Sequence, residues 1–241
     1  MNFSVELAKR VPFKLDRLSI LPHLFRKRII EPELLDHLPP EEARQNLADL
    51  VRINHDFGGH SVLRKTLAHV ARENNAFTLL DVGAASGDAA QVIRNLYPAA
   101  SVTSLDLHPV NLEAAPHPKL IADAFELPFG KQSFDFVLAS LFLHHFSDRQ
   151  VTDLLRSFYD LARRALLVCD LERHILPYWF LPLTKRLLGW NRVTVHDGRI
   201  SVRAGFRAEE LRKLANQAGI ERVEVETHRP AFRLSLICEK S

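Results

Sequence analysis

Apolar and polar positions follow two different periods along this chain of 241 residues. Between residues 77 and 170, short apolar runs alternate with segments in which apolar positions recur every three or four residues. Short apolar runs are typical of buried strands, and the wider spacing is typical of helices that pack through one face. Strands that alternate with helices predict an α/β fold with a parallel sheet and crossover helices.

The flanking segments have other patterns. Residues 1–75 have a broken helical pattern with several prolines, which predicts an N-terminal helical cap. Two strand-like runs, 222–228 and 232–238, are separated by three residues and predict a C-terminal antiparallel hairpin. We therefore expect residues 76–241 to form one core with a lid insertion near 174–205. This insertion is rich in aromatic residues, and it is expected to form a pocket wall, a weak membrane-surface contact, or a structural helix on the core.

Composition narrows the class of protein. Nearly half of the residues (46%) are hydrophobic, which is enough for one sizeable core but not for two large domains. The net charge is only +3 and the basic residues are scattered, so a nucleic-acid partner is not expected. The two cysteines, Cys169 and Cys238, stand in apolar runs and are expected to be packed thiols. No apolar run approaches the ~20 residues that span a bilayer, so a cytoplasmic location is expected.

Residues 79–90 have the most informative pattern, because an apolar run is followed by a glycine-containing turn and a predicted helix. Gly83 and Gly87 allow the backbone to approach a ligand closely, and a helix N-terminus offers free N–H groups. Asp106 ends the next apolar run, where a carboxylate accepts hydrogen bonds from ribose hydroxyls. These features indicate a nucleotide-type cofactor, although an ordinary strand–turn–helix has the same local pattern.

The spacing of the glycines in this turn distinguishes two classes of cofactor. Residues 83–88 lack the third glycine of the dinucleotide motif G-x-G-x-x-G. With Asp81, the turn resembles the first motif of the class I S-adenosylmethionine-dependent methyltransferases, except that Ala85 replaces a glycine. Asp123, after the predicted strand 120–122, and the run 133–140 resemble later motifs of the same family, in the same order.

This resemblance implies a Rossmann-like, seven-stranded, mostly parallel sheet with helices on both faces. It also implies S-adenosylmethionine as cofactor and S-adenosylhomocysteine as product. Asn54 lies in a segment similar to quinone-pathway methyltransferases and is expected to contact the methionine end, or else to end a helix before a glycine turn. The implied cofactor-binding residues are Asn54, Asp81, Gly83, Ala84, Ala85, Ser86, Gly87, Asp106, Leu107, Asp123, Ala124, Ser140 and Leu141.

Three segments resemble a narrower, bacterial subgroup that acts on small molecules of secondary metabolism: residues 140–148, 170–173 and 196–203. The resemblance implies a small, aromatic or polyketide-like acceptor that is methylated on oxygen or carbon. The sequence leaves the identity of the acceptor and the oligomeric state open. It also leaves two other functions open, namely a non-catalytic S-adenosylmethionine-binding protein and a nicotinamide-dependent oxidoreductase.

Histidines are the candidates for a general base, because a phenol or enol must lose a proton and imidazole titrates near neutral pH. His144 and His145 follow the predicted fourth strand, and their adjacent side chains are expected to diverge, so that one of them, preferably His144, faces the acceptor. His196 with Asp197 is the competing base, or a pair that fixes a turn before Gly198. His60 is expected to be a cap or surface residue. No cluster has metal-ligand spacing, so no metal site is expected.

Overall fold

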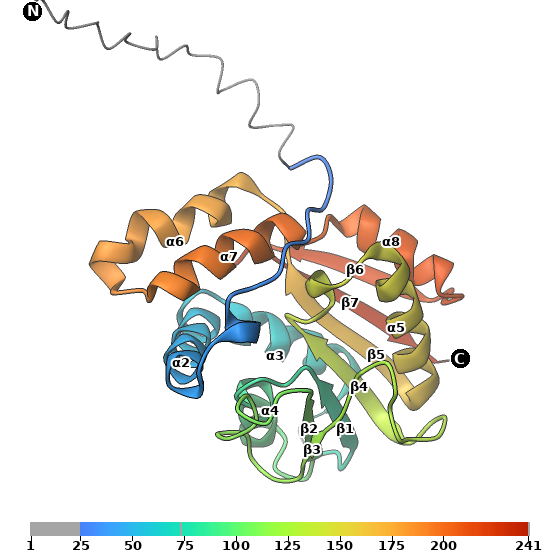
Figure 1. The fold of residues 1–241 in the computed structure, drawn as a ribbon. Helices are drawn as coiled ribbons and strands as arrows, with labels where there is room; N and C mark the ends of the chain where they lie inside the picture. The colour runs from blue at the N-terminus through green and yellow to red at the C-terminus, as the bar shows by residue number, and fades with distance from the viewer. Residues whose placement is uncertain (1–24, 73, 241) are drawn as a thin grey trace, which may run out of the picture.

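The computed structural model describes residues 25–72 and 74–240, so the first 24 residues of the predicted cap lie outside the described part. Its centre is a seven-stranded sheet with the order β3-β2-β1-β4-β5-β7-β6 (Figure 1). The Rossmann-like sheet predicted from the sequence is therefore confirmed. Its strands are β1 (Thr78–Val82), β2 (Ser101–Asp106), β3 (Lys119–Ile121), β4 (Phe134–Ser140), β5 (Ala162–Leu171), β6 (Val223–His228) and β7 (Arg233–Glu239).

The directions of the strands match the predicted pattern. Strands β1 to β5 are all parallel, and β7 runs antiparallel to both β5 and β6. The short connection between β6 and β7 permits only an antiparallel pair, which confirms the predicted hairpin. The antiparallel β7 separates β5 from β6, whereas a dinucleotide fold has six parallel strands in the order 3-2-1-4-5-6.

Helices cover both faces of the sheet. Successive side chains of a strand point to opposite faces, so neighbours such as Leu79 and Leu80 enter different cores. Leu80 packs in the core covered by α5 and α8, and Leu79 packs in the core covered by α3 and α4. The helices on the sheet are α3 (Gly59–Val70), α4 (Asp88–Leu96), α5 (Asp148–Leu161) and α8 (Ala208–Gln217).

The remaining helices lie beyond the carboxyl ends of the parallel strands. They are α2 (Pro40–Asp56), α6 (Ile175–Leu188) and α7 (Arg192–Ala204), with the short turns η1 (Leu35–His37) and η2 (Leu143–His145). The expected insertion near 174–205 corresponds to α6 and α7, which pack against each other at one side of the molecule (Figure 1). Gly198 lies inside α7, so the alternative that Asp197 fixes a turn there is wrong.

Two further predictions concern burial and membranes. Cys169 and Cys238 are free and buried, and burial raises the pKa of both thiols to about 12, as expected for packed thiols. Within the described residues, no helix is both long and apolar enough to cross a membrane.

Candidate active site

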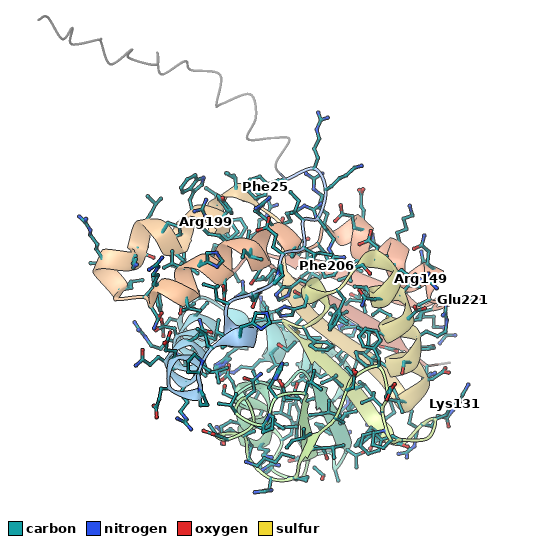
Figure 2. All side chains as sticks on the ribbon, in the orientation of Figure 1. Phe25, Lys131, Arg149, Arg199, Phe206 and Glu221 are labelled. Carbon is teal, nitrogen blue, oxygen red and sulfur yellow. The ribbon has the colours of Figure 1, made fainter. Side chains whose placement is uncertain are left out.

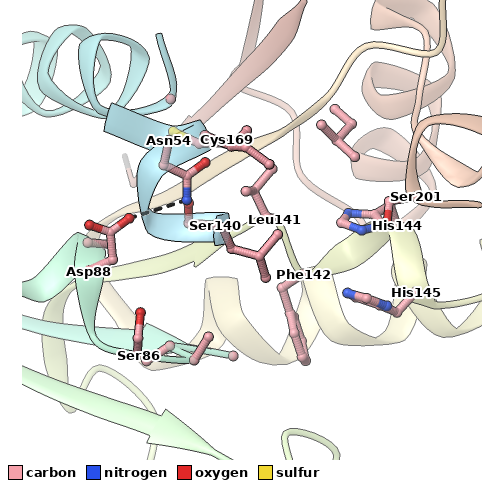
Figure 3. A pocket seen from close by; sticks show the side chains of 18 of the residues that line it. Asn54, Ser86, Asp88, Ser140, Leu141, Phe142, His144, His145, Cys169 and Ser201 are labelled. Atoms are coloured by element: carbon pink, nitrogen blue, oxygen red, sulfur yellow. Dashed lines mark hydrogen bonds between the residues drawn. The ribbon is translucent and has the colours of Figure 1, made fainter. Parts of the chain in front are cut away.

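A cavity of about 690 Å³ lies between the carboxyl ends of β1, β2 and β4 and the helices α2, α6 and α7. The strand order reverses between β1 and β4, and open α/β sheets bind ligands at such a switch point. Figure 3 shows Asn54, Ser86 and Asp88 at one end of the cavity, and His144 and His145 at the other. The two ends have different chemistry.

The glycine turn forms the floor of the first end. Gly83 has a φ of +69°, and a Cβ there would collide with the ring of Phe142, so the turn requires glycine for two reasons. Ala85 also adopts the left-handed region, with a φ of 46°, which costs roughly 1–2 kcal/mol for a residue with a Cβ. The alanine therefore strains the backbone at the position where the family motif has glycine.

Asp106 holds this turn in place. Its carboxylate accepts hydrogen bonds from the backbone N–H of Ala85 (3.0 Å) and of His108 (3.0 Å), and from the side chain of Asn111 (3.1 Å). The sequence predicted a carboxylate that receives ribose hydroxyls, and Asp106 does line the cavity. The sequence did not predict that Asp106 also anchors the turn. Its partner Asn111 belongs to a loop without a recognisable motif.

Two residues in the cavity wall have buried acceptor atoms without a hydrogen-bond partner among the described residues. These atoms are both carboxylate oxygens of Asp81 and the side-chain oxygen of Asn54. Burial, with the nearby charges of Asp88 and Asp106, raises the pKa of Asp81 to about 7. Unsatisfied buried acceptors are rare and costly, so these atoms are suited to a ligand with N–H donors. The α-ammonium group of S-adenosylmethionine has three such donors.

His60 belongs to the same end of the cavity, so its expected place at a cap or on the surface is wrong. It is 9% exposed, and its Nε2 lies 2.7 Å from the carboxylate of Asp88. The other carboxylate oxygen of Asp88 accepts a hydrogen bond from Asn54 at 3.2 Å. The turn at Gly58 brings the end of α2 and the start of α3 over α4, and sequence spacing did not reveal this arrangement.

The structure brings nearly all of the predicted cofactor-binding residues together. Gly87 is the exception, because it packs against Ala115 and Pro116 at the start of α4 and does not line the cavity. Asp123 also accepts a hydrogen bond from the backbone of Phe125 at 2.9 Å, which shapes the loop after β3. The predicted residues that line the cavity are Asn54, Asp81, Gly83, Ala84, Ala85, Ser86, Asp106, Leu107, Asp123, Ala124, Ser140 and Leu141.

The second end of the cavity contains two histidines. His144 and His145 both line it, and their ring centroids are 4.2 Å apart. The expectation that adjacent side chains diverge is wrong here, because both residues lie in the tight turn η2 rather than in an extended strand.

His144 is part of a buried polar network. Its Nδ1 lies 2.7 Å from the carboxylate of Asp170 at the end of β5. Its Nε2 lies 4.0 Å from the carboxylate of Glu33, which accepts a hydrogen bond from the hydroxyl of Ser201. Glu33 and Ser201 line the same cavity, and neither was predicted from the sequence.

The two histidines have opposite pKa shifts. Burial alone would lower the pKa of His144, but the charge and hydrogen bond of Asp170, with the charge of Glu33, outweigh burial and raise it. Burial, with the neighbouring charge of His144, lowers the pKa of His145 to about 3. His145 is therefore neutral at physiological pH, whereas His144 is the stronger base of the two.

Glu33, His144 and His145 place one potential metal-ligand atom each within 4.8 Å of one another, although no metal site was expected. The oxygen of Glu33 is 4.0 Å from His144 Nε2 and 3.8 Å from His145 Nδ1. Two ligand atoms on a tetrahedral ion with bonds of ~2.1 Å lie about 3.4 Å apart. Glu33 and the two histidines would therefore have to approach each other by several tenths of an ångström to bind such an ion.

His196 lies outside this arrangement. Its side chain is 49% exposed on α7 and does not line the cavity. Asp197, 2.9 Å away, also accepts hydrogen bonds from the backbone N–H groups of Leu34 and Leu35 at 3.0 Å. The structure thus uses this carboxylate to hold the segment that carries Glu33.

Comparisons with known proteins agree with this geometry. Residues 80–165 match the family model described as a methyltransferase domain. A relative, demethylmenaquinone methyltransferase of Thermotoga maritima, is 30% identical over 146 residues, which is 58% of this chain and 60% of that protein. The chain therefore spans less than two thirds of the length of this relative.

Solved structures share the fold. The structure of a putative O-methyltransferase from Nostoc punctiforme matches 76% of this chain and 56% of its own chain, with a TM-score of 0.57 and 17% identity. Human N-acetylserotonin methyltransferase in complex with S-adenosylmethionine matches 93% of this chain and 66% of its own, with a TM-score of 0.57 and 18% identity. Residues 80–165 thus match a methyltransferase domain, and the strand order and the glycine turn give the chain the fold of the class I S-adenosylmethionine-dependent methyltransferases.

Proposed function

We propose that this protein transfers a methyl group from S-adenosylmethionine to a small, aromatic or polyketide-like acceptor, on oxygen or carbon. The proposal rests on one observation: the two ends of a single cavity have different polar side chains. Unsatisfied acceptors and a glycine turn lie at one end, and a His–Asp pair lies at the other.

The first end suits the cofactor. Asp81 and Asn54 offer acceptors to the ammonium group of the methionine moiety, and Asp106 offers a carboxylate to the ribose. When bound, S-adenosylmethionine supplies an electrophilic methyl group on a sulfonium. Holding a nucleophile and a methyl group in line lowers the barrier by up to ~7–11 kcal/mol in ideal cases.

The second end suits an acceptor that must lose a proton. Asp170 orients the imidazole of His144 and stabilises the imidazolium that forms when Nε2 takes the proton of a hydroxyl or enol. Such a base adds roughly 10²–10⁴-fold to the rate. His145 is neutral and offers a hydrogen bond that positions the acceptor. Phe142 and Leu141, between the two ends, provide apolar surface for an aromatic ring.

The experiment that tests this function has two steps. Calorimetry with S-adenosylmethionine and with NADH establishes the cofactor, and binding of S-adenosylmethionine alone is expected. Transfer of a labelled methyl group is then measured on a panel of phenols, enols and quinols. Tight binding without transfer to any acceptor would favour a non-catalytic binding protein, and binding of NADH alone would favour an oxidoreductase.

A further inference from the structure

Helix α6 presents an apolar face to solvent. Leu176, Trp179, Leu183 and Leu187 are 60%, 40%, 77% and 83% exposed. They are separated by three, four and four positions, so they lie on one side of the helix. No other helix of the described residues exposes as many large apolar side chains. A continuous apolar face of this kind marks an interaction surface.

Positive charge surrounds this face. Residues 175–204 contain a single acidic residue, Asp197, which is buried. The chain at Arg26 and Lys27, both exposed, also lies beside α6, because the ring of Phe25 packs 5.5 Å from that of Tyr178 (Figure 2). The basic residues within 175–204 are Lys185, Arg186, Arg192, Arg199 and Arg203, besides His196. Arg203 forms an ion pair with Glu31 at 3.0 Å, so the positive charge comes from the other residues.

The exposed face is continuous with the cavity. Leu176 is exposed to solvent and also lines the cavity, together with Pro177, Phe180 and Leu181 of the same helix. Leu176 therefore joins the exposed apolar face of α6 to the apolar wall of the cavity. The polar acceptor end, with His144 and His145, lies in the same cavity.

We propose that α6 docks on an anionic lipid surface and that the acceptor has an apolar tail that enters the cavity from this surface. An amphipathic helix with basic flanks lies in the membrane interface, where apolar burial and attraction to anionic lipids add. At 14 residues, α6 is too short to span a bilayer, which takes ~20 residues. The choice of acceptor rests on the proposed methyl transfer, whereas the docking itself does not.

Co-sedimentation of the full chain with vesicles tests the docking. Vesicles of phosphatidylcholine alone are compared with vesicles that also contain phosphatidylglycerol. We expect binding to the anionic vesicles that weakens as salt increases, because exposed charges are screened. The variant Leu183→Glu/Leu187→Glu is expected to bind at least ~10-fold more weakly, since two charges enter the apolar face. The matched control is Ile121→Glu, which places a charge on an exposed apolar residue of β3, away from α6.

Folding of the double variant is checked by its affinity for S-adenosylmethionine, which is expected to be unchanged because neither side chain lines the cavity.

The apolar tail of the acceptor is tested separately, by comparing the binding of hexylphenol with that of phenol in the presence of S-adenosylhomocysteine. Burial of even part of the six-carbon chain predicts at least ~10-fold tighter binding of hexylphenol. Equal binding of the two phenols would overturn the apolar tail.

Three results would overturn the docking. One is a lack of binding to anionic vesicles at low salt, and another is equal binding of the double variant. The third is a dimer in sedimentation velocity that the double variant dissociates, because a second copy would then cover this face. A chain that binds vesicles but transfers no methyl group would contradict the proposed function alone.

Discussion

His144 and Asp170 share a buried hydrogen bond of 2.7 Å between the turn η2 and the end of β5. Both residues are almost completely inaccessible to solvent, at 3% and 0% exposure. Burial alone would raise the pKa of Asp170, but the charge and hydrogen bond of His144 outweigh burial and lower it. The pair therefore favours a carboxylate beside an imidazolium, which is the state of a base that has accepted a proton.

The variant Asp170→Asn tests this relationship. Loss of the carboxylate removes the influence that raises the pKa of His144, so the rise of the rate with pH should move to lower pH. The plateau of kcat should fall roughly 10²–10⁴-fold, because an amide neither fixes the tautomer nor stabilises the imidazolium. The measurement is kcat as a function of pH. A pH profile with an unchanged midpoint would contradict the role of Asp170.

Alanine variants of the three histidines separate the candidate bases. His144→Ala should lose at least ~10²-fold in kcat, with the loss shrinking as pH approaches the pKa of the acceptor. His196→Ala should stay within about threefold of the wild type, because His196 does not line the cavity. His145→Ala should raise KM more than it lowers kcat, since His145 positions the acceptor. If all three variants keep their activity, no general base operates.

The affinity for S-adenosylmethionine should depend on the ionisation of Asp81. The pKa of this residue is about 7 without ligand, and an ammonium group binds the carboxylate but not the neutral acid. Affinity should therefore rise between about pH 6 and pH 8, with release of a proton on binding at the lower end of this range. Calorimetry in buffers of different ionisation enthalpy measures this release. Equal affinity at both ends of the range would contradict a direct contact.

The variant Asp81→Asn should lose this pH dependence and bind the cofactor more weakly. It should also be more stable than the wild type at about pH 8. The reason is that a carboxyl group whose pKa is raised in the folded state destabilises the protein increasingly as pH rises above its unfolded pKa, and an amide cannot ionise. Thermal unfolding at this pH checks the prediction, and the opposite change in stability would indicate that the substitution disrupts packing instead.

Gly189 is a control for substitution of Gly83 in the cofactor turn. Both have φ near +70°, but a Cβ at Gly83 meets Phe142, whereas a Cβ at Gly189 meets nothing within 4 Å. Gly189→Ala should cost about 1–2 kcal/mol of unfolding free energy from backbone strain alone. Gly83→Ala should cost roughly 1–3 kcal/mol more and should also weaken cofactor binding. Denaturant unfolding and calorimetry measure the two effects, and equal losses of stability would exclude the steric contribution.

Removal of metal ions should leave methyl transfer unchanged. Glu33, His144 and His145 lie farther apart than the ligands of a tetrahedral ion, and His144 is assigned to proton transfer. Activity after dialysis against EDTA should therefore stay within about threefold of the untreated protein. Loss of activity that zinc or magnesium restores would assign the cluster to a metal instead.

The sequence by itself determined the sheet, and it predicted most of the residues that line the end of the cavity proposed to bind the cofactor. Strand and helix periods predicted alternating strands and helices between residues 77 and 170, where β1 to β4, α4 and α5 lie. The cofactor end depends on short segments in which a strand, its terminal acid and the next turn are adjacent in sequence. Such local patterns are recognisable as motifs. In any fold with this strand order, the loops at the carboxyl ends of the parallel strands lie close together.

The sequence named His144 and His145 as candidate bases, but only the tertiary structure decided which groups surround them. Glu33 meets Ser201 across 168 positions of sequence, and His144 meets Asp170 across 26. The subgroup segments 140–148, 170–173 and 196–203 contain His144, Asp170 and Ser201, but the sequence pattern does not show which of their side chains meet, because that depends on how α7 and the segment before α2 pack over the strand ends. The pKa shifts depend on the same packing, since burial and a neighbouring carboxylate, rather than residue type, make His144 a stronger base than His145.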